Sequence, residues 1–355
     1  MVYGSRWKVY VEALGFTAVL GSVFGAAAGA VVLTPPFTGA LFGMVSGVVD
    51  AFGLTALIAG AEVFLPRTRF AFALSRRPFL AVVLVKVVAY FAVVVAVIGG
   101  RLGPSVALLL AGPERAPQFA AQIDAAFPRG LMIVISSMIV VLLVMLRHAS
   151  QLVGEGSFRN ILRGRYHRPR AEERFFLFVD VVGSTPVAER LGPLAVHRYL
   201  DRIFQIASDP VDDHGGDVFQ YVGDELVVTW PLDAGRKEAR PLACFFAIEA
   251  ALAAAAPEFE REFGSVPRLR AALHAGEVVT GEIGGSRRAI VFHGDVMNTT
   301  SRIENATRDL GRPFLVSEEA LKRLDGAERY ALEDLGPQRL RGREAPMRVY
   351  AAARP

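Results

Sequence analysis

Hydrophobic residues are concentrated before residue 148, where they form four long runs, whereas the rest of the chain alternates between apolar and polar positions. The runs lie near residues 11–33, 37–65, 79–100 and 130–147. Each approaches or exceeds the about 18–20 residues that an α-helix needs to cross a bilayer. The first run is too long, and too closely followed by others, to be a cleaved signal peptide. The pattern predicts a four-helix transmembrane anchor over residues 1–148.

Positive charges flank these runs on one side of the predicted membrane. They precede the first run, fill the connector between the second and third runs, and follow the fourth. The residues are Arg6, Lys8, Arg67, Arg69, Arg76, Arg77, Arg147, Arg159, Arg163 and Arg165. By the positive-inside rule, both termini are cytoplasmic. We therefore expect a multi-pass protein of the inner (cytoplasmic) membrane, in contact with lipid.

A few residues inside the runs carry further information. Gly21, Gly25 and Gly29 recur every four residues, which lets another helix approach closely, either within the bundle or in a dimer. Asp50 and Lys86 lie in the second and third runs. Charged groups at membrane depth face protein or water, so they either pair or reach the interface, or they sense an unknown ligand or ion.

Composition agrees with two domains in different surroundings, joined by a linker. The chain has 355 residues, 52% of them hydrophobic, and a mean hydropathy of +0.37. Its one cysteine, Cys244, excludes an internal disulfide. The net charge is +4, and the basic residues cluster beside apolar segments, so we expect no nucleic-acid partner. Residues 149–172 are polar and arginine-rich and predict a cytoplasmic linker beside anionic lipid.

The cytoplasmic domain, residues 173–355, alternates strand and helix patterns. A buried strand at Phe175–Val182 is followed by a helix that Gly183-Ser184-Thr185 opens. The later elements expected are a helix to about 206, a hairpin at 217–230, a helix at 237–262, strands at 268–279 and 288–293, and a helix at 296–309 capped by Asp295. This order predicts an α+β fold with a ferredoxin-like split βαβ sheet.

Two carboxylates are placed where such a sheet would bring them together. Asp180 lies near the end of the first strand, and Asp224 lies in the hairpin VFQYVGDELVVTW. Alone, each is typical of an ordinary turn, but side by side they repel unless a cation lies between them. The strand-to-helix turn Gly183-Ser184-Thr185 offers backbone N–H groups to a triphosphate. Oxygen ligands beside phosphate favour Mg²⁺ or Mn²⁺, and two such ions can assist departure of pyrophosphate.

A third motif lies at the start of the last predicted helix. Residues 294–303 read GDVMNTTSRI, and Asn298 and Arg302 are four residues apart on one helical face. Alone, the pair is typical of a solvated surface. Following the helix start Gly294-Asp295, it suggests groups directed at a sugar and a phosphorus atom.

Together these motifs resemble the class III nucleotidyl cyclases, the adenylate and guanylate cyclase family. The resemblance rests on FVDVVGST, YVGDELVVTW, AALHAGEVVTGEIG and FHGDVMNTTSRIENATR, and it covers about residues 173–351. It implies homodimers with active sites at the interface. It also implies that the ribose 3′ oxygen of a nucleoside triphosphate attacks the α-phosphate and releases pyrophosphate.

The resemblance assigns roles to individual residues. Asp180 and Asp224 would bind two metal ions, with the carbonyl of Val181. The β- and γ-phosphates would be held by Val182, Gly183, Ser184 and Thr185. Asn298 would orient the ribose and Arg302 would stabilise the transferring phosphate. Arg341, in LRGREAPMRVY, stands where the family has a phosphate-contacting lysine, so a fork of donors replaces a point charge.

Base recognition departs from the family pattern. Gln220 stands at the position of the adenine-reading lysine, and Val291 at that of its aspartate or threonine partner. An amide can serve adenine or guanine. We favour ATP, and a membrane-anchored adenylate cyclase that forms 3′,5′-cyclic AMP, over a guanylate cyclase. Glu225 is expected to be a salt-bridged or exposed hairpin residue.

Two further alternatives remain open. Diguanylate cyclases have a hairpin, Gly-Gly-Asp-Glu-Phe, that is similar to Val222-Gly-Asp-Glu-Leu here. That family does not explain Asn298 and Arg302, and its product would be a cyclic dinucleotide. The other alternative is a catalytically weak, nucleotide-binding membrane sensor, which the unusual Gln220 and Val291 leave open.

Overall fold

The computed structural model describes the C-terminal domain almost completely and the N-terminal region in part. The described residues are 19, 22–23, 26, 36–64, 79–99, 133–139, 141–142, 144–146, 165–284, 289–343 and 345–354. The chain divides into two compact units, Met1–Ala149 and Ser150–Pro355. Each is described by itself below.

The N-terminal unit contains apolar helices. Helix α2 spans Pro36–Phe64, and α4 spans Phe79–Val94 and continues into the π-helical turn η2, Val95–Gly99. Among the described residues, one helix, Ala81–Ile98, is long and apolar enough to cross a membrane, with a mean hydropathy of 2.8. Shorter apolar helices cover Met44–Ile58 and Ile133–Leu146.

The predicted four-helix anchor is thus not shown as a whole. Most of the first predicted run, and the charged connectors, lie outside the described residues. Within the described part, Val83, Tyr90 and Val94 of α4 form a small apolar core with Val144. Asp50 in α2 and Lys86 in α4 are both partly buried, and their role stays a prediction.

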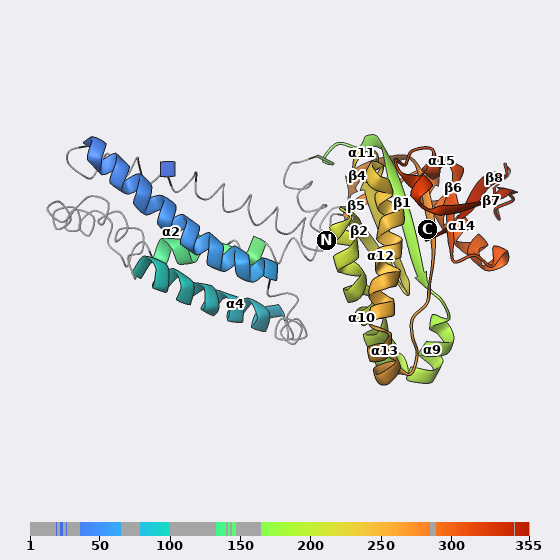
Figure 1. The fold of residues 1–355 in the computed structure, drawn as a ribbon, viewed down its shortest axis with the longest axis horizontal. Coiled ribbons are helices and arrows are strands. Elements are labelled where there is room, and N and C mark those ends of the chain that lie inside the picture. The colour runs from blue at the N-terminus through green and yellow to red at the C-terminus, as the bar shows by residue number, and fades with distance from the viewer. Residues whose placement is uncertain are drawn as a thin grey trace. The chain divides into compact units, whose positions relative to one another are not determined.

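The C-terminal unit is built on an eight-stranded sheet (Figure 1). Its strands are β1 (Arg170–Val181), β2 (Asp217–Val222), β3 (Glu225–Pro231), β4 (Leu269–Ile283), β5 (Ala289–His293), β6 (Phe314–Ser317), β7 (Ala331–Gln338) and β8 (Met347–Ala353). The order is β2-β3-β1-β4-β6-β8-β7, and β5 pairs with β4. The β4–β6 pair is parallel and the other pairs are antiparallel.

From Phe175 to Val179, strand β1 is continuously apolar because helices cover both faces of the sheet. Phe175, Leu177 and Val179 belong to the core beneath α10 (Pro193–Asp213) and α12 (Arg240–Ala254). Phe176 and Phe178 face the opposite side, where they pack with Val296 of α14 (Asp295–Leu310). The α+β prediction is confirmed, with β1 central and α14 covering one face.

The predicted helix at 237–262 is broken. It consists of the 3₁₀-helix η3 (Lys237–Ala239), α12 and α13 (Ala256–Phe263), with a bend of 57° before α13. Pro257 is the second residue of α13, and a proline ring clashes with the carbonyl four residues earlier and has no N–H to donate. The continuous alanine-rich pattern conceals this break.

The start of α14 also differs from its prediction. Asp295 is the first helical residue and Gly294 is the N-cap, which has no side chain to form a cap hydrogen bond. The Asp295 carboxylate instead accepts a hydrogen bond from Thr299 Oγ1 at 2.9 Å. The short helix α15 (Glu318–Leu321) and the strands β6, β7 and β8 were not predicted individually.

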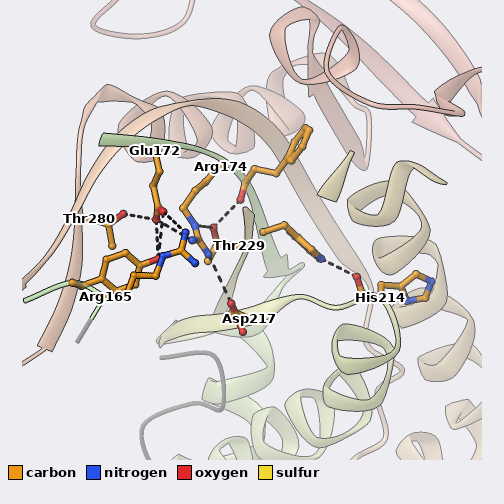
Figure 2. A network of polar contacts seen from close by, with 10 residues as sticks. Arg165, Glu172, Arg174, His214, Asp217, Thr229 and Thr280 are labelled. Carbon is orange, nitrogen blue, oxygen red and sulfur yellow. Dashed lines mark hydrogen bonds and ion pairs between the residues drawn. The ribbon is translucent and has the colours of Figure 1, made fainter. Parts of the chain in front are cut away.

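A buried polar network surrounds Arg174, toward the start of β1 (Figure 2). Arg174 is 3% exposed; its Nε donates to Thr229 Oγ1 and its Nη1 to Glu172 Oε1, each at 3.0 Å. Glu172 also accepts hydrogen bonds from Thr280 Oγ1 at 2.8 Å and from the Tyr166 hydroxyl at 3.0 Å. The network therefore links Tyr166, near the start of the domain, to strands β1, β3 and β4.

The charge state of Glu172 follows from these contacts. Burial alone would raise its pKa, but the hydrogen bond from Thr280 and the charge of Arg174 outweigh burial and hold the pKa below its usual value. Both partners of the Arg174–Glu172 pair are thus charged and largely buried. Removing Arg174 would leave Glu172 with Arg165 as its counter-ion, a half-exposed side chain at the longer distance of 3.6 Å.

We expect Arg174→Met to lower the free energy of unfolding by about 3 kcal/mol, because it removes the buried counter-ion of Glu172 and leaves only the more distant, half-exposed Arg165. The matched control is Arg323→Met, which breaks the exposed pair between Arg323 and Glu173 and should cost under about 1 kcal/mol. Denaturant unfolding of the full chain in detergent, followed by tryptophan fluorescence, measures both. Equal losses in the two variants would show that the network adds nothing to stability.

Candidate active site

The hairpin between β2 and β3 has a two-residue loop, because Val222 pairs with Glu225. The first loop residue is Gly223 with φ +63°, a left-handed conformation that glycine adopts without strain. The second is Asp224, at the exposed edge of the domain. The sequence therefore places a carboxylate at the tip of a tight turn, where the backbone fixes its position.

Asp180 lies in a row of charged residues across three strands. It pairs with Glu225 of β3 on one side and with Arg270 of β4 on the other. Facing residues of neighbouring strands place their side chains on the same face, here the face that α14 covers. Because Asp224 directly precedes Glu225, the register brings the two predicted metal-binding aspartates together.

Asp180 belongs to a cluster of four acidic and two basic side chains. Arg270 forms ion pairs with Asp180 and, through its Nε at 2.6 Å, with Glu304 of α14. Arg308 of α14 lies 3.8 Å from Asp180 Oδ2. Burial raises the pKa of Asp180 to about 6; the charge of Asp224 and a hydrogen bond with it add to this, and Arg270 opposes it. Asp180 is therefore a carboxylate whose negative charge is only partly compensated.

Glu225 differs from its prediction. It is partly buried, and in the described part of the chain it has no salt bridge. Burial raises its pKa to about 7, and the charges of Glu304, Asp180 and Asp224 act in the same direction. The expectation of a salt-bridged or exposed hairpin residue is therefore wrong, because the strand register points this side chain toward the other acids.

The arrangement fits a divalent cation. Asp180 Oδ2 is buried and accepts no hydrogen bond of ordinary geometry; its contacts are the ion pairs with arginines. Two neighbouring carboxylates that repel each other are the donor set that a hard cation relieves. Within the described residues, no three acidic, histidine or cysteine side chains form a ready metal cage. A cation at Asp180 and Asp224 would therefore need further ligands, such as substrate phosphates.

The turn after β1 is formed as the sequence predicts. Helix α9 spans Ser184–Leu191 and begins after Gly183, whose φ is +73°. The Ser184 hydroxyl hydrogen-bonds to Asp224 Oδ2, which ties this turn to the hairpin. The first N–H groups of a helix have no partner within it, so those of Ser184 and Thr185 can face an anion.

Val181 and Val182, also assigned to the site, precede this turn. The Val182 N–H already donates to the Arg268 carbonyl at 2.8 Å. The Val182 N–H is thus engaged within the fold, and the part of Val182 in phosphate binding stays a prediction. Val181, assigned a metal-binding carbonyl, is the last residue of β1 and its side chain is buried.

Asn298 and Arg302 project from the first half of α14 and do not reach the aspartates of the same chain. Asn298 is exposed, and Arg302 Nη1 lies 3.9 Å from Asp295 Oδ1. Among the described residues, no hydrogen bond or ion pair joins either of them to Asp180 or Asp224. Asp180 instead meets the second half of the helix, at Arg308. One chain thus contains both halves of the predicted site without joining them.

The closing basic segment lies against the start of α14. Arg343 Nη1 donates to Thr299 Oγ1 at 2.7 Å and lies 3.3 Å from Asp295 Oδ2. A Cβ at Gly342 would lie 3.7 Å from Arg302 Nη2, so this backbone packs beside the Arg302 guanidinium. Arg341 is exposed. Arg343, which the sequence did not single out, therefore supplies a polar contact of this segment with α14.

The two predicted base-reading residues lie on strands that meet through their neighbours. Gln220 is exposed on β2, next to a bulge at Phe219, and Val291 is partly buried on β5. The rings of Phe219 and Phe292 pack at 4.8 Å between centroids. This contact brings the two strands together but gives neither Gln220 nor Val291 a charged partner.

Sequence reasoning missed Arg270 and Glu304. Both are buried or nearly so, with side-chain exposures of 14% and 6%. One signal was present, an arginine in an otherwise apolar strand, RLRAALHAG, where a charged residue on a buried face needs an acidic partner. Its partner on α14 is defined only by the pairing of β1 with β4 and by the packing of α14 on these strands.

Comparisons with known proteins agree with this geometry. The family model described as the adenylate and guanylate cyclase catalytic domain matches residues 167–353. The chain therefore belongs to the adenylate and guanylate cyclase family.

Named relatives are similar over the same domain. Adenylate cyclase 2 of Rhizobium meliloti (strain 1021) is 42% identical over 199 residues, which cover 56% of this chain and 55% of that protein. An adenylate cyclase of Mycobacterium tuberculosis (strain ATCC 25618 / H37Rv) is 30% identical over 185 residues, covering 52% and 39%. The chain thus spans about half, or less, of the length of these relatives.

A solved structure, that of a bacterial light-regulated adenylyl cyclase, has a TM-score of 0.53 and 18% identity to this chain. The match covers 62% of this chain and 65% of that one. At this identity the likeness shows the fold alone.

Proposed function

We propose that this protein is a membrane-anchored adenylate cyclase that converts ATP to 3′,5′-cyclic AMP and pyrophosphate at a homodimer interface. The observation that carries the proposal is the pairing of Asp180 and Asp224 beside the N-terminus of α9, with Ser184 hydrogen-bonded to Asp224. Family membership and the 42% identity to an adenylate cyclase support the same reaction.

Each group has a role that its position supports. Asp180 and Asp224, with the Val181 carbonyl, would hold Mg²⁺ or Mn²⁺, which activates the ribose 3′ oxygen and neutralises charge on the leaving pyrophosphate. The N–H groups of Ser184 and Thr185 and the positive end of α9 would bind the β- and γ-phosphates. The exposed Arg341 would add a cation to those phosphates.

The proposal requires two chains. Asn298 would orient the ribose and Arg302 would stabilise charge at the α-phosphate. Along a helix axis, Asn298 lies about 9 Å from Glu304, the α14 residue that shares Arg270 with Asp180. A second copy, related by a two-fold axis, would bring its Asn298 and Arg302 to the first copy's aspartates.

The N-terminal unit would anchor the enzyme in the cytoplasmic membrane. Support comes from the candidate span Ala81–Ile98, the apolar helix α2 and the arginine-rich connectors. With the positive-inside rule, the catalytic domain would then lie in the cytoplasm. Asp50 and Lys86 are the residues through which this unit would respond to a ligand or ion.

We expect Asp180→Asn and Asp224→Asn each to lower kcat by about a hundredfold or more, because a lost metal ligand costs several kcal/mol of transition-state stabilisation. The control is Asp309→Asn, which changes the same group at an exposed site on α14. Cyclic AMP formation by membranes containing the full chain measures all three. Retention of more than about a tenth of wild-type kcat in Asp180→Asn would argue against direct metal binding.

Gln220 and Val291 give a second prediction, on base choice. Gln220→Lys combined with Val291→Asp should raise the preference for ATP over GTP by about tenfold, because a charge-assisted contact to adenine replaces an ambivalent amide. The measurement is the ratio of kcat/KM values for the two nucleotides. An unchanged ratio would remove these positions from the base pocket. A wild-type preference for GTP would favour the guanylate cyclase alternative.

The shared site gives a third prediction, on complementation. Asp180→Asn homodimers and Asn298→Ala homodimers each have two defective sites. A mixed dimer places both defects in one site and leaves the other intact. With random pairing, co-expression should restore about a quarter of wild-type activity. If mixed dimers form, as tested by differential tags, and activity stays absent, each chain must carry a complete site of its own.

A further inference from the structure

Arg270 forms an ion pair with the same Asp180 oxygen that a metal ion would bind. It faces Asp180 directly across the β1–β4 pair, and its Nη2 contacts Asp180 Oδ2. That oxygen is buried and accepts no hydrogen bond of ordinary geometry, and it forms ion pairs with Arg270 and Arg308. Any cation that binds this oxygen must therefore share it with Arg270 or displace Arg270.

The structure also supplies a second partner for Arg270. The Nε of the same guanidinium donates to Glu304 Oε1 at 2.6 Å. The planar fork of an arginine can hold two carboxylates at once, which a lysine ammonium of one charged atom does less well. Asp180 and Glu304 lie on different elements, β1 and α14, so the guanidinium bridges strand and helix.

Charge balance allows the bridge to open. The cluster holds four carboxylates, those of Asp180, Asp224, Glu225 and Glu304. The opposing cations are Arg270, 14% exposed, and Arg308, 58% exposed and therefore well screened by water. If Arg270 leaves Asp180, it keeps its ion pair with the buried carboxylate of Glu304, so its charge still has a counter-ion.

We propose that Arg270 is a positioning residue that serves as the resident counter-ion of Asp180, and that it releases Asp180 and keeps its ion pair with Glu304 when a divalent cation binds. The proposal rests on the metal-binding role of Asp180 proposed above. In it, Arg270 lowers metal affinity by competition, and Glu304 raises metal affinity by drawing Arg270 away. Metal affinity is thus set by an exchange of ion pairs between β1 and α14.

The test is Mn²⁺ binding to the full chain in detergent without nucleotide, with free Mn²⁺ measured by its electron paramagnetic resonance signal. Arg270→Gln should tighten binding about fivefold or more, because a competing charge at contact distance is removed. Glu304→Gln should weaken it by a similar factor. In the Arg270→Gln background, Glu304→Gln should weaken binding less, because there is no guanidinium left to hold.

Arg308→Gln is the matched control. It removes the same charge from a neighbour of the same carboxylate, but from an exposed side chain, so binding should change less than about twofold. An equal effect of Arg308→Gln and Arg270→Gln would show general electrostatics and would overturn the proposal.

A purely structural role predicts a different pattern. Arg270→Gln would then lower the unfolding midpoint and leave Mn²⁺ affinity unchanged or weaker, which also overturns the proposal. Should Arg270→Gln fail to fold, Glu304→Gln decides the question, since glutamine still accepts a hydrogen bond from Arg270. Unchanged or tighter Mn²⁺ binding in Glu304→Gln contradicts the exchange.

Asp180→Asn separates this inference from the proposed function. If Asp180→Asn does not weaken Mn²⁺ binding, the metal site itself is misplaced and both proposals fail. If it does weaken binding and Arg270→Gln has no effect, the metal site stands and only the exchange is rejected.

Discussion

The pairing of β1 with both β3 and β4 is the constraint on which the rest of the site depends. It places Glu225, Asp180 and Arg270 in one row and sets Asp224 beside Asp180. A shift of one residue in either pairing would turn these side chains to the opposite face. The apolar residues Phe175 to Val179 hold the register, because each alternate side chain fits a different core.

The same row explains why a single chain contains an incomplete site. The α14 residues that reach Asp180 belong to the second half of the helix, while Asn298 and Arg302 lie on its first half. The second half of the helix lies at the aspartates of its own chain. Under the proposed function, the first half would serve a second copy. Arg343 and Asp295 fix that first half from the side of the closing segment.

Much of this is predictable from the amino-acid sequence, and the limits have physical causes. Strand β1, the hairpin and α14 follow from periodicity and turn residues, and these are enough to pair Asp180 with Asp224. The strong helical pattern around Pro257 conceals the break that this proline causes. Glu225, Arg270 and Glu304 are not predictable in this way, because their environment arises from strand register and helix packing. The N–H of Val182 is lost to the Arg268 carbonyl, just before β4, for the same reason.

For the N-terminal unit, the sequence predicts more than the described residues show. Hydropathy alone predicts four spans, while the described residues show one helix long and apolar enough to cross a membrane. The buried polar network around Arg174 lies at the point where the chain enters the catalytic domain. Any influence of the N-terminal unit that travels along the chain must pass through this hydrogen-bonded segment.

The central claim is that this chain cyclises a nucleoside triphosphate, and product identification tests it most directly. Membranes containing the full chain would be incubated separately with ATP and with GTP in the presence of Mn²⁺, and the products separated and identified by mass. An adenylate cyclase would form 3′,5′-cyclic AMP and pyrophosphate in equal amounts from ATP, with less cyclic product from GTP. Absence of any cyclic mononucleotide, or a cyclic dinucleotide formed from GTP, would contradict the claim.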